Sequence, residues 1–207
     1  MNFIQQTSRY EHQGKARHYQ RTYEYRDQQG VIQWDCEVFG SCISAPTVFT
    51  PQAHGCDSFT MTAKGKFMNA TYYLDDASSK RFAIITRKGI GFRWKILDPD
   101  DNEIFRVVDP ASWKEAVVRD IFGGLPDGFA VIQSNTFAAR IAKEDLVEGA
   151  KTKPGNRLGK FLDKVFTSRG MTLRIEDDRS PSLDTRVLVA VMTLLQVHDI
   201  TGAASSG

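Results

Sequence analysis

The sequence predicts a mostly β fold (α+β) in which antiparallel strands surround an apolar helix near the C-terminus. Short segments of alternating apolar and polar residues recur along most of the chain, with turn-forming residues between them. Residues 187–195 are apolar at nearly every position, so a helix formed there is apolar on all sides and has to be buried. A membrane-spanning helix needs about 20 predominantly apolar residues. The run between Asp184 and His198 is shorter, which places the helix in a protein core.

The first predicted hairpin lies in the N-terminal third of the chain. Tyr23 and Tyr25 stand at even spacing before a polar turn at residues 27–30, and Ile32 and Trp34 alternate with polar residues after it. Alternation with a period of two is typical of a half-buried strand. Three more strands are predicted after it, at residues 59–63, 66–74 and 81–87.

A second hairpin is predicted at residues 92–108. Phe92, Trp94 and Ile96 share one face, residues 98–102 form the turn, and residues 104–108 make the returning strand. Another pair of strands is expected at residues 128–142, with its turn at Ser134 and Asn135, and the last strand at residues 169–175.

Two additional amphipathic helices are predicted between strands. In the first, at residues 109–124, Asp109 is the expected N-cap and Pro110 the first helical residue. In the second, at residues 156–166, Leu158, Phe161 and Val165 recur at helical spacing. Both helices are expected to pack one apolar face against the rest of the fold.

The order of these elements predicts one domain. Many consecutive antiparallel strands favour a sandwich or a closed barrel. A terminal helix that is apolar in every direction favours a sheet that closes around it. We therefore predict a single barrel domain over residues 17–201, with tails at residues 1–16 and 202–207.

Composition predicts a cytoplasmic protein. The chain has 207 residues and a net charge of +2, close to ordinary globular values. Its N-terminal residues lack the apolar core of a signal peptide. The three cysteines, Cys36, Cys42 and Cys56, are an odd and sparse set. We interpret them as free thiols in a reducing compartment.

The strands leading through "GMTLRIEDDRSPSLDTRVLVAVMTLLQVHDI" into an apolar helix resemble the tubby C-terminal-like superfamily. Its members include phospholipid scramblases and LURP-one-related proteins. "KFMNATYYLDDASSKRFAIITRKGIGFRWKILDPDDNEIFRVV" is similar to the central hairpins of the LURP-one-related group. The resemblance implies a closed antiparallel β-barrel of about twelve strands around a central C-terminal helix. The chain lacks the Pro-rich N-terminal region and clustered cysteines of scramblases, so it resembles the LURP-one-related proteins more closely.

The main candidate site is basic and lies around the hairpin at residues 85–97. Arg93 and Lys95 alternate with apolar residues and are expected to face outward, beside Arg87 and Lys88. Tubby domains resemble this arrangement, since they hold phosphoinositide headgroups with a Lys/Arg pair spaced by one residue on a strand. Forked guanidinium donors suit phosphate oxygens. The alternative is a solvated strand face on which lysine protects an edge.

A secondary basic patch follows later in the chain. It comprises Lys151, Lys153, Arg157, Lys160 and Lys164. Such a patch suits an anionic membrane surface, and the alternative is an ordinary solvated helix face. The nearly neutral chain has no recognisable nucleic-acid motif, so no nucleic-acid partner is expected.

Other polar groups give weaker signals. His54 and Cys56 form a possible base and thiol pair, but no orienting third group is visible. Residues 98–103 begin like a calcium loop but have Glu103 at the sixth position, where glycine is required. Asp184, in the acidic segment 176–184, is interpreted as a helix N-cap, and calcium binding near that segment stays open. No metal site and no cofactor are predicted.

These observations predict a non-enzymatic protein that binds an anionic membrane lipid, or a protein partner at the membrane surface. The protein is expected to be cytoplasmic or peripheral to a membrane, with no transmembrane segment. One alternative is a scramblase-like role in phospholipid movement between leaflets. Another is an unrecognised enzyme that uses His54 and Cys56.

Overall fold

The structure is a computed structural model that describes residues 3–12, 19–39, 46–65, 70–87, 93–109, 128–145, 169–175 and 183–205. It is mostly β, with antiparallel strands and one C-terminal helix, α3, at Thr185–Ser205. The strands are β1 Phe3–His12, β2 Tyr19–Arg26, β3 Ile32–Phe39, β4 Thr47–Pro51, β5 Phe59–Lys64, β6 Thr71–Asp76, β7 Arg81–Arg87, β8 Arg93–Leu97, β9 Glu103–Val108, β10 Gly128–Gln133, β11 Thr136–Asp145 and β12 Arg169–Ile175.

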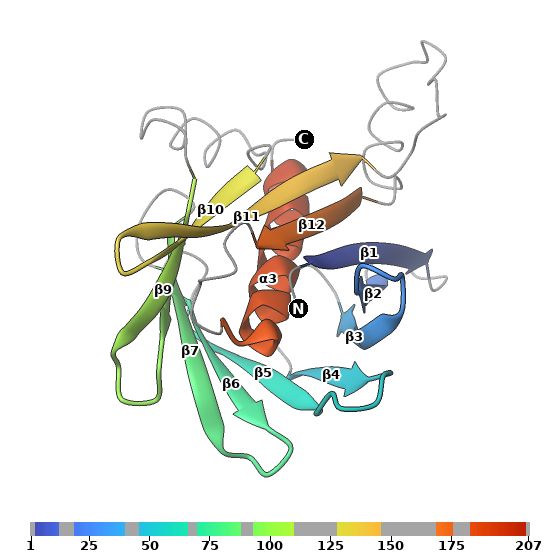
Figure 1. The fold of residues 1–207 in the computed structure, drawn as a ribbon. Helices are drawn as coiled ribbons and strands as arrows, with labels where there is room; N and C mark the ends of the chain where they lie inside the picture. Colours follow the sequence, from blue (N-terminus) through green and yellow to red (C-terminus); the bar gives the residue numbers. More distant parts are fainter. Residues whose placement is uncertain are drawn as a thin grey trace.

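Consecutive strands pair antiparallel along the whole series (Figure 1). Strand β1 pairs with β2 on one side and with β12 on the other, where Phe3 is the partner of Arg174, so the strand order is that of a closed barrel. Because the strands alternate in direction, the β2–β3, β4–β5, β6–β7, β8–β9 and β10–β11 connections lie at one end. We call this end the turn end. Helix α3 also begins there, at the bottom of Figure 1.

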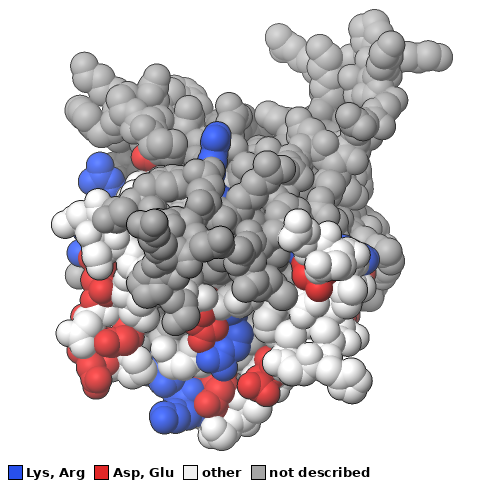
Figure 2. All heavy atoms as spheres, viewed as in Figure 1, with Lys and Arg blue, Asp and Glu red and all other residues white. Residues whose placement is uncertain are grey.

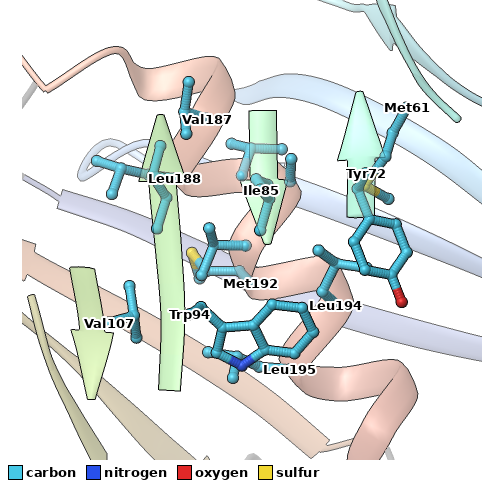
Figure 3. Close-up of a cluster of buried hydrophobic side chains, with 14 of the residues drawn as sticks. Met61, Tyr72, Ile85, Trp94, Val107, Val187, Leu188, Met192, Leu194 and Leu195 are labelled. Atoms are coloured by element: carbon cyan, nitrogen blue, oxygen red, sulfur yellow. The ribbon is translucent and has the colours of Figure 1, made fainter. Parts of the chain in front are cut away.

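Helix α3 runs through the interior and forms the centre of the core. Every residue from 187 to 197 is buried, over about three turns of helix. Leu188, Val189 and Ala190 follow one another and therefore point about 100° apart around the helix, and each is 0% exposed. Figure 3 shows strand side chains such as Ile85 and Trp94 directed at the helix. The predicted apolar helix enclosed by strands is therefore confirmed.

The start of α3 is fixed by Asp184. Its Oδ1 accepts a hydrogen bond from the backbone amide of Arg186 at 2.9 Å, which is the geometry of an N-cap. The Arg186 guanidinium returns to the same carboxylate, with 2.7 Å between Nη2 and Oδ2, and lies 4.0 Å from the Phe82 ring centroid. The predicted N-cap is confirmed.

Within the described residues, no helix combines the length and apolar character needed to cross a bilayer.

Three hairpins at the turn end share one design, in which an aspartate organises the turn. The Asp98 Oδ1 accepts hydrogen bonds from the backbone amides of Asp100 and Asn102, both at 2.9 Å. Asp27 and Asp76 make the equivalent contacts in the β2–β3 and β6–β7 turns. The fourth residue of each turn has positive φ; these residues are Gly30, Ser79 and Asp101. The predicted turns at residues 27–30 and 98–102 are confirmed. The predicted β10–β11 turn is confirmed as well, since Ser134 and Asn135 form a two-residue turn with positive φ at both positions.

Some elements differ from the sequence predictions. Residues 1–16 were predicted as a tail but contain β1, because its alternating residues are mostly polar and give no apolar signal. Strand β4 was not predicted, since it has only five residues and ends in proline. Helix α3 extends to Ser205, four residues into the predicted C-terminal tail. The two predicted amphipathic helices, at residues 109–124 and 156–166, lie outside the described residues apart from Asp109.

Candidate anion-binding surface

Strand β8 positions two of the predicted basic residues on the outer surface. Its residues alternate, so Trp94 and Ile96 are buried against the core while Arg93 and Lys95 are exposed. The predicted outward orientation of Arg93 and Lys95 is confirmed. This result follows directly from the period of two in the strand.

Arg87 does not lie beside them on the outer surface, and this part of the prediction is wrong. Its side chain is only 1% exposed, and its guanidinium carbon lies 5.7 Å from the centroid of the Trp94 ring. That distance is within the range of a cation–π contact. The reason is again the alternation of the strand, because Ala83 and Ile85 face inward and Arg87 is in phase with them. The spacing within "RFAIITR" could have predicted this position.

The other basic candidates are not described by the structure. Lys88 lies in the connection between β7 and β8, and the secondary basic patch, Lys151, Lys153, Arg157, Lys160 and Lys164, lies in the connection between β11 and β12. Both connections fall outside the described residues. Their roles stay predictions.

Lys95 belongs to a small network of ion pairs on the outer surface. Its Nζ lies 3.2 Å from Glu103 Oε2, and Arg106 Nε lies 2.9 Å from Glu103 Oε1. Lys95 and Arg106 are direct partners across the β8–β9 ladder. Arg106 also donates a hydrogen bond of 2.9 Å to Asn135 Oδ1 in the β10–β11 turn. One carboxylate is thus shared between two cations.

A row of paired residues connects Arg93 to a second exposed arginine. Arg93 is the Cα partner of Val108, Val108 of Ala130, and Ala130 of Arg140. Directly paired residues occupy the same face of a sheet, so Arg93 and Arg140 lie on the outer surface, roughly 14 Å apart across three strand spacings. Arg140 stands between buried Ala139 and Ile141 and is exposed. Neither arginine forms an ion pair with any residue that the structure describes.

We call the outer surface formed by Arg93, Lys95, Arg106 and Arg140 the basic face. Arg106 and Arg140 were not predicted as site residues, although both occupy outward positions in alternating segments, "EIFRVV" and "FAARIA". The pairing of β8 with β9, β9 with β10 and β10 with β11 brings the four residues onto one surface, and this pairing is not visible in one sequence. Three cations of this face, Arg93, Lys95 and Arg140, are exposed, and Arg106 is half-buried.

The charge changes sign toward the turn end. Asp98, Asp100 and Asp101 lie in the β8–β9 turn, and Figure 2 shows acidic side chains gathered over this hairpin at the lower left. Hydrogen bonds from the side chain and backbone amide of Asn102 hold the pKa of the Asp98 carboxyl below its usual range. The turn therefore keeps its negative charge under mildly acidic conditions.

The predicted pair of His54 and Cys56 lies in the β4–β5 connection. The Cys56 thiol donates a hydrogen bond to Gln33 Oε1 at 3.3 Å, and His54 is exposed. Burial and the neighbouring Asp57 carboxylate raise the pKa of the Cys56 thiol. A nucleophilic cysteine needs the opposite shift, because the thiolate is the reactive form. Cys36 and Cys56 are free thiols, as predicted, and Cys42 lies outside the described residues.

Known proteins give no independent view of this surface. Comparisons with family models, curated proteins and solved structures find no match. The functional interpretation therefore rests on the charges and geometry of the described residues.

Proposed function

We propose that the chain is a non-enzymatic barrel protein that binds anionic membrane lipid, with a phosphoinositide-type headgroup, through the basic face. The observation that carries the proposal is the row from Arg93 to Arg140. It holds two guanidinium groups on one surface with only Val108 and Ala130 between them.

The chemistry of the basic face suits phosphate. A guanidinium presents several N–H donors in a fixed plane and binds phosphate oxygens in pairs. Arg93 and Arg140 are available for such contacts, since no described carboxylate pairs with them. Lys95 and Arg106 share Glu103, so this network keeps an excess of one positive charge. A phosphorylated headgroup supplies the missing anion.

The resemblance to tubby-like proteins supports the same proposal. The strand order and the enclosed helix agree with the barrel that the resemblance implies. A scramblase-like role is less favoured, because the apolar part of α3 is used to fill the barrel. An enzyme based on Cys56 is less favoured because the pKa of its thiol is raised.

Vesicle co-sedimentation tests the proposal with a charge-matched control. The test variant is Arg93→Gln with Arg140→Gln, and the control is Lys80→Gln with Arg81→Gln in the β6–β7 hairpin. Each basic residue near an anionic surface contributes about 1 kcal/mol, so we expect the test variant to bind phosphoinositide vesicles at least about tenfold more weakly. We expect the control to bind like the wild type, and the affinity to fall as salt concentration rises.

Two results would overturn the proposal. The first is wild-type protein that binds no anionic vesicle at low salt. The second is equal loss of binding by the test and control variants, which would indicate a response to total charge alone. Competition by a soluble inositol phosphate separates recognition of the headgroup from attraction to the membrane surface. Binding only to membranes that carry proteins would point to a protein partner.

A further inference from the structure

The distribution of charge along the barrel has a definite direction. The Asp98, Asp100 and Asp101 carboxylates lie at the tip of the β8–β9 hairpin. Next along the strands comes the network of Lys95, Glu103 and Arg106, and then the row that begins with Arg93. The described surface of this hairpin therefore changes from acidic to basic over its length.

Among the other described connections at the turn end, β2–β3 and β4–β5 are acidic, whereas β10–β11 carries no charge. The β6–β7 hairpin balances two aspartates with Lys80 and Arg81. Asp27, Asp57 and Asp76 lie in or beside these connections, and Asp184 caps the helix that starts there. Arg186 is bound to Asp184, and Arg81 is bound to Asp75. Among the described residues, the turn end is thus predominantly acidic.

The separation between the two regions is large enough to matter in salt. Arg93 precedes Asp98 by five residues, which corresponds to roughly 16 Å along a strand. The Debye length is about 8 Å at physiological ionic strength. When an anionic surface contacts the row from Arg93 to Arg140, salt therefore screens most of its repulsion by the acidic turns. An anionic surface that contacts the turns themselves is strongly repelled.

We infer that the barrel binds an anionic bilayer in one orientation, with the row from Arg93 to Arg140 against the lipid and the turn end directed away from it. This inference rests on the proposed function and adds the direction of binding. Its basis is the attraction between the negative charge of the bilayer and the row from Arg93 to Arg140, together with the repulsion expected between the bilayer and the acidic tip of the β8–β9 hairpin.

Environment-sensitive fluorophores on the two ends of one hairpin test the orientation. The background carries Cys42→Ser and Cys56→Ser, and it keeps Cys36, which is buried with a raised thiol pKa and should not react in the folded protein. One reporter is attached at Val108→Cys in the basic row, and the other at Pro99→Cys in the turn. Ala130→Cys provides a second reporter in the row if a label at position 108 weakens binding.

We expect the row reporters to brighten and shift to the blue with phosphatidylcholine vesicles that contain phosphatidylserine or a phosphoinositide. We expect no change at position 99, and no change at any position with phosphatidylcholine alone. An equal or larger response at position 99 would overturn the orientation. Vesicle binding by co-sedimentation without a response in the row would overturn it as well. Absence of co-sedimentation would instead refute the proposed function, so the two failures are distinguishable.

Discussion

Tyr25 on β2 and Thr193 on α3 hydrogen-bond to each other through their hydroxyl groups inside the barrel, although they are 168 positions apart in the chain. The Thr193 hydroxyl donates its one hydrogen to the Val189 carbonyl oxygen at 2.9 Å. We therefore infer that Tyr25 is the donor in the contact with Thr193. A polar contact of this kind fixes the rotation of an apolar helix that nonpolar packing alone would leave less specified.

Removal of this contact should destabilise the protein. Thr193→Val removes the acceptor of a buried hydroxyl, which costs about 1–3 kcal/mol. Tyr25→Phe with Thr193→Val removes both partners, so the double variant should lose less free energy of unfolding than the sum of the two single variants. Urea denaturation of the four proteins measures this coupling. Strict additivity would contradict the contact.

A charge in the centre of α3 should prevent folding. Val191 is 1% exposed, and Val191→Asp places a carboxylate where no described partner can neutralise it, at a cost of several kcal/mol. The control is Val48→Asp on the outer surface, since Val48 is 50% exposed. We expect the control to stay soluble and to melt cooperatively. A cooperative thermal transition of the Val191 variant would refute the enclosed helix.

The positive-φ positions of the three aspartate turns should respond in opposite directions to substitution. Gly30→Ala should destabilise the protein by about 1 kcal/mol, because an L side chain is strained at positive φ and no other atom lies near the new Cβ. Ser79→Gly relieves that strain and should stabilise the protein by less than about 1 kcal/mol, since glycine costs more backbone entropy. Thermal unfolding measures both changes. Two shifts of the same sign would contradict the shared geometry.

The Asp98 carboxylate should give stability that depends on pH. The pKa of this carboxyl is lower in the folded protein than the ordinary value of 3.8, so its negative charge stabilises the folded state above pH 3.8. That stabilisation is lost as the pH falls through the lowered pKa. Asp98→Asn keeps an oxygen acceptor but has no charge. The difference in unfolding free energy between wild type and this variant should therefore shrink in acid. A difference that does not change with pH would show that the charge is unimportant.

The cysteines should react in two stages. Cys56 is partly accessible and should be alkylated slowly in the folded protein, while Cys36 should be protected because it is buried with a raised thiol pKa. After denaturation without reduction, all three thiols should react. Mass spectrometry counts the modified residues. Recovery of only one free thiol would indicate a disulfide and an oxidising compartment.

Local periodicity was sufficient to predict most of the fold. The alternation around Trp94 and Ile96 correctly placed Arg93 and Lys95 outside, and the uniformly apolar residues 187–195 correctly predicted an enclosed helix. Strand β1 was missed because its pairing with β2 and β12 depends on backbone hydrogen bonds rather than on an apolar pattern.

The candidate site was less predictable than the fold. Arg87 was misplaced because its charge was given more weight than its phase on β7, where Ala83 and Ile85 face the core. Arg140 was missed because its alignment with Arg93 passes through two intervening strands. Such alignment is a property of the tertiary structure and has no signature in a single segment.

The enclosed helix has a consequence for biosynthesis. Helix α3 follows the twelve strands that the structure describes, yet it occupies the centre of the core. A ribosome therefore releases the complete sheet-forming sequence before the residues that fill its interior. Until then the inward faces of Tyr23, Phe49 and Phe105 have no helix to cover them. Since non-local contacts slow folding and uncovered apolar surfaces aggregate, the nascent chain should depend on chaperones until α3 is synthesised.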